Sequence, residues 1–109
     1  MNPDDGGGAA ETPEPQPSSS ALTRIVTIRN KRGLHARAAA KFVTLAETFG
    51  ASVDVARDGQ VVPARSIMGL MMLGAGRGAE IELRAEGWDA REALEALAAL
   101  VEAGFNEQD

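Results

Sequence analysis

The spacing of apolar residues predicts a strand and then a helix in the first half of the chain. Thr23–Arg29 is rich in β-branched residues and places Val26 and Ile28 on one face, as a half-buried strand does. Ala36–Phe49 favours a helix, which Gly50 is placed to end. The exposed side of this helix is expected to carry polar residues every three or four positions, namely Arg37, Lys41, Thr44 and Thr48. The buried side is expected to consist of Ala36, Ala39, Ala40, Phe42, Val43, Leu45, Ala46 and Phe49.

A hairpin and a short helix are predicted next. Ser52–Arg57 and Gln60–Pro63 flank Asp58-Gly59, a pair that suits a two-residue hairpin turn because both of its positions need a positive φ. Pro63 is compatible with a strand end or an edge strand. Ser66 then opens the short apolar run Ile67–Leu73, and the glycine-rich stretch 74–78 is expected to be a loop.

One more strand and helix complete the predicted order. Glu80–Glu86 alternates charged and apolar residues, which is the pattern of a half-buried strand. Asp89 and Glu92 have the spacing of a helix cap, and Gly104 is placed to end the helix that follows. The inner face of that helix is expected to carry Ala90, Leu94, Leu97, Ala98 and Val101. The order β-α-β-β-α-β-α predicts an α+β fold in which one open sheet carries its helices on one face.

Composition divides the chain of 109 residues near residue 20. Residues 1–20 hold four of the five prolines, a run of three glycines, a run of three serines and four acids, but no Leu, Ile, Val or aromatic residue. Such a segment buries too little apolar surface to offset the entropy lost when it becomes ordered. The sequence therefore predicts an acidic, disordered tail over residues 1–20 and one folded domain over residues 21–109.

Residue usage and charge exclude several classes of protein. The chain has no cysteine, which excludes disulfides, zinc–thiolate sites and cysteine nucleophiles. It has no secretory signal and no apolar run of the roughly 20 residues that cross a bilayer, so we expect a soluble, cytoplasmic protein without membrane insertion. Residues 21–66 carry eight basic and three acidic side chains, whereas residues 67–109 carry three and nine. A basic first half favours an anion or an acidic partner, while the near-neutral domain and its few aromatic residues disfavour nucleic acid.

His35 is the only histidine of the chain, and it directly precedes the predicted helix. The first turn of a helix has free N–H groups and a partial positive charge, which favour an anion and a neutral imidazole. Arg37 and Lys41 are nearby, and Gly33 is expected to keep the approach open, so the site suits nucleophilic attack on a phosphoryl group. No second catalytic group or metal site is evident, and position alone leaves a surface histidine without a chemical role as the simpler interpretation.

Two motifs change that balance. Residues 30–39 (NKRGLHARAA) resemble the phosphorylation-site signature of the HPr family, the histidine-containing phosphocarriers of the bacterial phosphotransferase system. Residues 64–73 (ARSIMGLMML) resemble the regulatory serine segment of the same family. The resemblance covers about residues 22–106. It implies an open-faced β-sandwich of four antiparallel strands under three helices, which agrees with the predicted element order.

The resemblance also implies a phosphocarrier that is not a turnover enzyme on its own and that uses no cofactor and no metal. His35 would accept a phosphoryl group, on Nδ1, from enzyme I charged by phosphoenolpyruvate, and would donate it to a histidine of an enzyme IIA protein. Arg37 would offset the charge of the phosphate. Ala38 stands where the family usually has proline, a change that keeps the helix and loses only rigidity. The family further implies a monomer. The sugar-transport and nitrogen-related branches both stay open, with residues 102–107 and the methionine-rich run closer to the latter.

Ser66 has two interpretations. On local grounds its hydroxyl is a helix N-cap. The resemblance implies instead, or in addition, a phosphorylation site for HPr kinase/phosphorylase, which would add about −1.5 to −2 charge at that position. Both interpretations stay open at this point.

The apolar run after Ser66 is too long to be buried in one short helix. Part of it is expected to be core, and part an exposed patch that docks several partners. The residues assigned to docking are Ile67, Met68 and Met71, with the cations Arg37, Lys41 and Arg65 around them to attract acidic partner surfaces. A second function therefore remains as an alternative, namely a regulatory binding module that acts through the His35/Ser66 face without histidine phosphotransfer.

Overall fold

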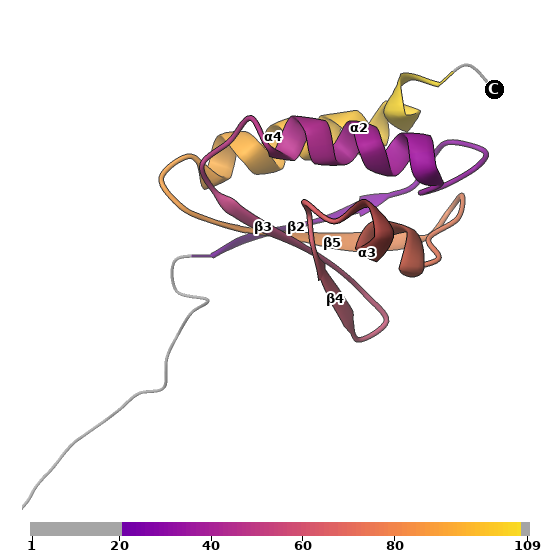
Figure 1. The fold of residues 1–109 in the computed structure, drawn as a ribbon, viewed down its shortest axis with the longest axis horizontal. Coiled ribbons are helices and arrows are strands. Elements are labelled where there is room, and N and C mark those ends of the chain that lie inside the picture. Colours follow the sequence, from indigo (N-terminus) through magenta and orange to yellow (C-terminus); the bar gives the residue numbers. More distant parts are fainter. Residues whose placement is uncertain (1–20, 108–109) are drawn as a thin grey trace, which may run out of the picture.

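A computed structural model describes residues 21–107, and the tail predicted over residues 1–20 lies outside this range. Residues 21–107 form four strands, three α-helices and a closing 3-10 turn (Figure 1). The elements are β2 (Leu22–Thr27), α2 (Ala36–Ala46), β3 (Ser52–Arg57), β4 (Gln60–Pro63), α3 (Ile67–Met72), β5 (Glu80–Glu86), α4 (Ala90–Glu102) and η2 (Gly104–Asn106). The predicted order and the α+β class are confirmed.

The strands form one antiparallel sheet in the order β2-β5-β3-β4. The hairpin between β3 and β4 turns at Asp58 and Gly59, whose φ values are 50° and 83°, as the predicted turn requires. Helices α2 and α4 lie side by side over one face of the sheet, and α3 packs against α2 and β4 (Figure 1). The result is the open-faced sandwich that the resemblance implies.

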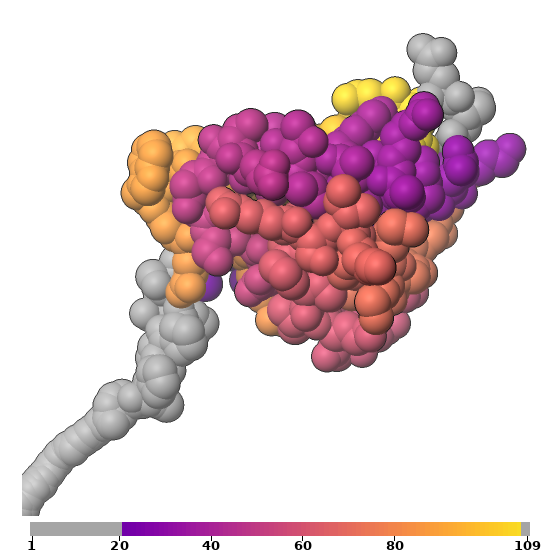
Figure 2. Space-filling model, in the orientation of Figure 1, coloured from indigo at the N-terminus to yellow at the C-terminus, as the bar shows by residue number. Residues whose placement is uncertain are grey.

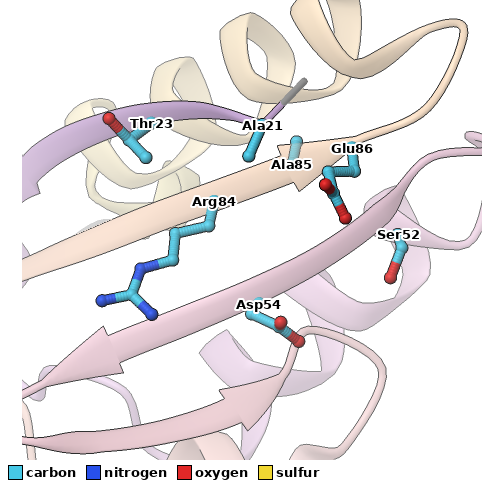
Figure 3. Close-up of a pocket in the computed structure, with 7 residues that line it drawn as sticks. All are labelled: Ala21, Thr23, Ser52, Asp54, Arg84, Ala85 and Glu86. Atoms are coloured by element: carbon cyan, nitrogen blue, oxygen red, sulfur yellow. The ribbon is translucent and has the colours of Figure 1, made fainter. Parts of the chain in front are cut away.

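The uncovered face of the sheet carries polar side chains from alternate strand positions. Thr23, Arg84 and Asp54 lie in one cross-strand row, and together with Glu86 and Ser52 they line a shallow pocket there (Figure 3). This pocket is lined by strand residues and by Ala21, which precedes β2, and it contains no residue of the helix end at which His35 is predicted to act.

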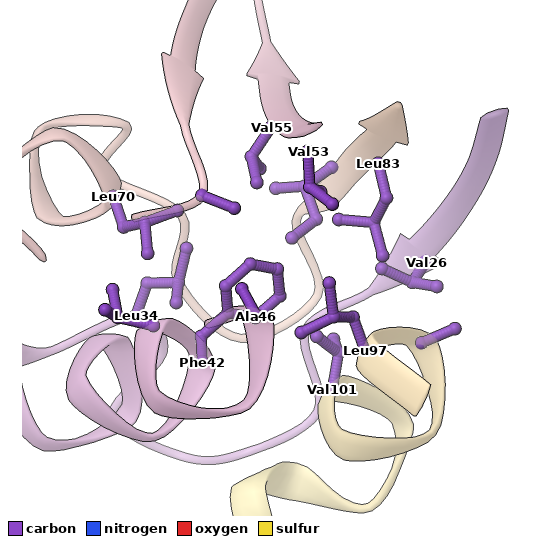
Figure 4. Packing of buried hydrophobic residues seen from close by; sticks show 14 of the residues in the cluster. Val26, Leu34, Phe42, Ala46, Val53, Val55, Leu70, Leu83, Leu97 and Val101 are labelled. Carbon is purple, nitrogen blue, oxygen red and sulfur yellow. The ribbon is translucent and has the colours of Figure 1, made fainter. Parts of the chain in front are cut away.

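The core lies between the sheet and the helices. Val26, Val55 and Leu83 point from the strands toward Phe42 of α2 and Leu97 of α4, and each of these side chains is at most 2% exposed (Figure 4). Burying a side chain of this size contributes about 1.5–3 kcal/mol. The inner face predicted for α4 is confirmed, since Ala90, Leu94, Leu97, Ala98 and Val101 are all buried.

Two predicted boundaries and one predicted core residue were wrong. Strand β2 ends at Thr27, because Ile28 already bonds to the loop before β5. The Ile28 N–H donates to the Ala79 carbonyl, and the Ile28 carbonyl accepts from the Gly78 N–H. Helix α2 ends at Ala46 rather than at Phe49, since the N–H groups of Thr48 and Phe49 bond three residues back and tighten the chain into a turn. Ala36 is exposed because it is the first residue of α2, at the margin of the helical layer.

Asp89 occupies the N-cap position of α4, as predicted, but the capping bond expected of its side chain is absent. Its two carboxylate oxygens accept hydrogen bonds from the backbone N–H groups of Gly50 (2.9 Å) and Ala51 (2.8 Å) instead. Asp89 is 6% exposed, and these bonds compensate for its burial while they tie the α2–β3 connection to the start of α4.

No helix within residues 21–107 has the length and apolar character needed to cross a membrane.

Candidate phosphorylation site

His35 is the N-cap residue of α2, as the sequence predicts. Its backbone is extended (φ −76°, ψ 178°), and the Arg37 backbone N–H donates to its Nδ1 over 3.3 Å. An N-cap side chain satisfies one of the four free N–H groups at the start of a helix. Nδ1 therefore faces the positive end of α2, where the remaining N–H groups and the helix dipole favour an anion.

The loop before His35 is shaped by Gly33 in a way that the sequence analysis misjudged. Gly33 has a φ of +68°, and a Cβ placed on it would lie 2.5 Å from the carbonyl oxygen of Ala75. Leu34 N–H donates to that same oxygen over 3.0 Å. Gly33 thus allows the loop to pack against the 74–76 segment, and this close packing, rather than an open approach to His35, explains the glycine.

The second ring nitrogen of His35 is held by a residue from the far end of the chain. Nε2 lies 2.6 Å from Oε2 of Glu107, and the two side chains are only 16% and 11% exposed. Asn30 Nδ2 donates to the other carboxylate oxygen of Glu107 (3.0 Å) and to the Gly33 carbonyl (2.8 Å). Residues 103–107 form the closing segment of the domain. Figure 2 shows this segment, in yellow, against the residues that lead into α2, in purple.

The carboxyl group of Glu107 is held in its ionised form. Burial disfavours the carboxylate, but the hydrogen bonds from Asn30 and His35 and the charges of His35 and Lys41 outweigh that effect and lower the pKa of Glu107 below its ordinary value of 4.5. The carboxylate is thus available to His35 throughout the neutral range.

The lowered pKa of Glu107 predicts a pH-dependent contribution to stability. A carboxyl group whose pKa is lower in the folded than in the unfolded state stabilises the fold fully at pH values above its unfolded-state pKa. This contribution is lost as the pH falls below 4.5 and through the lower pKa of the folded state. Between pH 6 and pH 3 the free energy of unfolding should therefore fall less in Glu107→Gln than in the wild type. Urea titrations across this range measure the difference, and parallel curves for the two proteins would contradict the assignment.

The closing segment is anchored by a buried side chain and by a lysine. Phe105 is fully buried, and Lys41 Nζ donates to the Phe105 carbonyl over 2.7 Å. Lys41 is half-buried and engaged in this way, although the sequence analysis assigned it to docking. Arg37 is exposed, and its guanidinium forms no ion pair with any of residues 21–107, so it remains available to an anion beside His35.

Within the described part of the chain, no three His, Asp or Glu side chains come together as a metal site requires. The groups gathered at the site are the His35 imidazole, whose Nδ1 accepts one long hydrogen bond from the Arg37 backbone N–H, and the Arg37 side chain at the start of α2.

Comparison with known proteins assigns the family. The family profile described as "PTS HPr component phosphorylation site" matches residues 22–103. The chain belongs to the HPr phosphocarrier family of the phosphotransferase system. It is 50% identical over 86 residues to the phosphocarrier protein HPr of Cupriavidus necator, an alignment that covers 79% of this chain and 97% of that protein. It is 48% identical over 86 residues to the phosphocarrier protein NPr of Shewanella violacea, with 79% and 94% covered.

The fold agrees with a solved structure of the same family. HPr-C-His from Thermoanaerobacter tengcongensis superposes with a TM-score of 0.77 at 44% identity, and the match covers 81% of this chain and 99% of that chain. Similarity to both an HPr and an NPr is consistent with the nitrogen-related branch, without separating it from the sugar-transport branch.

The docking residues predicted for this HPr-family protein lie mostly on α3. Ile67, Met68 and Met71 are 41%, 69% and 44% exposed, and Met72 adjoins them at 69%. Leu70 and Leu73, from the same run, are buried, so the run divides into core and surface as expected. In Figure 2 this helix forms the front of the molecule directly below α2. Arg65, the third predicted cation, is exposed and donates weakly to the Phe49 carbonyl (3.4 Å).

Ser66 caps α3. Its Oγ accepts a hydrogen bond from Gly69 N–H over 2.9 Å, and a Cβ on Gly69 would lie 3.0 Å from that oxygen. The capping interpretation is therefore confirmed. Glycine at position 69 lets the cap close tightly over the first turn.

Removing this cap should destabilise the domain measurably. Ser66→Ala leaves the Gly69 N–H without its partner, which costs about 1 kcal/mol for a typical N-cap. Denaturant unfolding should show this loss, whereas Ser52→Ala, which removes an exposed hydroxyl at the start of β3, is the matched control and should change the stability little. A Ser66→Ala variant as stable as the wild type would mean that the cap contributes nothing.

Glu107 and Asn30 belong to the site although neither was predicted to have a role in it. Both are ordinary polar residues in the sequence, and Glu107 is 72 positions away from His35. The only signal that could have drawn attention to the segment is Gly104, whose φ of +65° turns the chain out of α4 and back toward Asn30.

Proposed function

We propose that this protein carries a phosphoryl group on Nδ1 of His35, accepted from enzyme I and donated to a histidine of an enzyme IIA protein. The observation that carries the proposal is the placement of Nδ1. It faces the N-terminus of α2 beside the exposed Arg37, while Nε2 is occupied by Glu107. Membership of the HPr family supports the same reaction.

The acceptance step uses the lone pair of Nδ1. It forms the N–P bond as the bond between phosphorus and its donor atom on enzyme I breaks, and the electron pair of that bond stays with the donor atom. The arriving phosphoryl oxygens meet free N–H groups of the first turn of α2 and the Arg37 guanidinium, which offset their charge. Donation to enzyme IIA is the same displacement in the opposite sense, so the carrier is unchanged after each cycle.

Partner binding is proposed to use the exposed side of α3. Ile67, Met68 and Met71 present flexible apolar side chains that can fit more than one partner. Arg65 and Arg37 add positive charge at the margin of this patch, which would attract acidic partner surfaces. We also assign Ser66, at the N-cap of α3 in this patch, as a site for HPr kinase/phosphorylase. A phosphate there would place about −1.5 to −2 charge within the docking surface and weaken binding of acidic partners.

The same exposed patch supports a second function, a regulatory module that binds partners without carrying phosphate on His35. The two functions differ in one respect that can be measured. Transfer requires the His35 ring, whereas binding through α3 does not.

The experiment is a two-stage transfer assay on the full chain. The protein is incubated with its cognate enzyme I and phosphoenolpyruvate, and intact mass is followed before and after acid or base treatment. We expect one added phosphoryl group that is labile in acid and stable in base, and that passes to enzyme IIA when this is added. A folded protein that stays unlabelled, while another HPr is labelled by the same enzyme I, would overturn the carrier function and leave the binding module.

A further inference from the structure

We infer that Glu107, held by Asn30, is a positioning residue that keeps the proton of His35 on Nε2 and stabilises the positive charge that the ring gains with the phosphoryl group. The first part stands on geometry alone, and the second rests on the proposed function. Glu107 lies outside both motifs from which the site was predicted, and Asn30, the first residue of the first motif, was given no role there.

The hydrogen bonds on the two sides of the ring agree on one tautomer. An ionised carboxylate can only accept, so the 2.6 Å contact with Glu107 requires a proton on Nε2. On the opposite side the Arg37 N–H donates to Nδ1, which must then offer a lone pair. A carboxylate that orients a histidine through one nitrogen leaves the other as the reactive atom.

Asn30 fixes the carboxylate in turn. Its amide is 2% exposed and bridges Glu107 Oε1 and the Gly33 carbonyl, so the carboxylate is oriented from the loop that precedes His35. Lys41 holds the Phe105 carbonyl two residues before Glu107. The Glu107 carboxylate is thus held directly by Asn30 and indirectly by Lys41, which fixes the backbone of its segment. Such supporting contacts are what orient a reactive group.

The charge balance of the transfer step explains why a carboxylate is useful there. When Nδ1 gives its lone pair to phosphorus while Nε2 keeps its proton, the ring becomes a cation. Glu107 at 2.6 Å from Nε2 stabilises that cation. In donation, the N–P bond breaks with its electron pair returning to Nδ1, and the ring departs as a neutral imidazole rather than as an anion. Keeping the proton on Nε2 therefore favours both steps.

The first test is a spectroscopic signature that needs no partner. Long-range ¹H–¹⁵N spectra of the full chain at neutral pH report which ring nitrogen of His35 carries the proton. We expect Nε2–H in the wild type and a mixture of tautomers in Glu107→Ala. In Glu107→Gln the amide oxygen stays with the Asn30 donor, so the amide NH₂ faces Nε2 and should favour the Nδ1–H form. Glu102→Gln, which removes an exposed carboxylate on α4, is the matched control and should match the wild type.

The second test is the rate of phosphoryl transfer from enzyme I and to enzyme IIA in the same variants. We expect a loss of about 10- to 100-fold in Glu107→Ala, a larger loss in Glu107→Gln, and no change in Glu102→Gln. A wild type that transfers phosphate, with Glu107 variants that keep both its tautomer and its rates, would overturn this inference and leave the proposed function intact. If the tautomer shifts as expected in the Glu107 variants but the wild type accepts no phosphoryl group, the positioning role is supported and the carrier function is overturned.

Discussion

His35→Ala should accept no phosphoryl group from enzyme I at any concentration of phosphoenolpyruvate. The ring supplies the lone pair that forms the N–P bond, and no other histidine exists in the chain to replace it. Radiolabel or intact mass measures the loss directly. The effect should be complete, unlike the graded losses expected for residues that only support the ring.

Folding of the variant must be established alongside. His35 contributes a long cap bond of 3.3 Å and the 2.6 Å contact with Glu107, so His35→Ala should unfold at a lower denaturant concentration than the wild type but stay folded without denaturant. Ser66→Ala is the matched control, because it also removes a helix cap but leaves the ring in place. Labelling of His35→Ala would mean that the nucleophile has been assigned to the wrong residue, whereas a folded Ser66→Ala should still be labelled.

Phe105→Ala should lower the free energy of unfolding by about 3–5 kcal/mol, the usual cost of emptying the space of a buried phenylalanine. Phe105 is fully buried although it belongs to a short 3-10 turn near the end of the chain. Its side chain anchors the segment that carries Glu107. Denaturant unfolding measures the stability, and the NMR signals of the His35 ring report whether Glu107 is still in contact.

A matched pair of milder variants separates the loss of stability from the loss of contact between Glu107 and His35. Phe105→Leu and Phe42→Leu each reduce a fully buried aromatic side chain, but only Phe105 is in the segment that reaches His35. We expect both to lose stability and only Phe105→Leu to shift the His35 ring signals. Equal shifts in both variants would mean that the ring responds to general loosening of the core rather than to the closing segment.

Most of the fold follows from local signals in the sequence. The Asp58-Gly59 pair fixes a hairpin because few residue pairs adopt two successive positive φ angles. The apolar stripe of α4 is regular enough to identify all of its buried residues except Ala93. The errors lie at element ends, such as the last turn of α2, where hydrogen bonds three residues back compete with the helical pattern.

The site, like the fold, is predictable where it depends on residues close together in the sequence and not where it depends on distant ones. The position of His35 at a helix N-terminus is a local property and is readable from residues 33–37. The contacts of Glu107 with Asn30 and His35 join the two ends of the domain, 77 and 72 positions apart. Apart from Gly104, the residues next to them in the sequence give no sign of these contacts. Lys41 is similar, since the same side chain could meet a partner or the Phe105 carbonyl, and only the packed structure shows that it meets the carbonyl.

The atom that carries the phosphate is the most direct test of this account. After phosphorylation by enzyme I, ¹H–¹⁵N and ³¹P–¹⁵N correlations of the labelled protein identify which ring nitrogen is bonded to phosphorus and which carries hydrogen. We expect phosphorus on Nδ1 of His35 and a proton on Nε2, still in contact with Glu107. Phosphorus on Nε2, or on any residue other than His35, would contradict it.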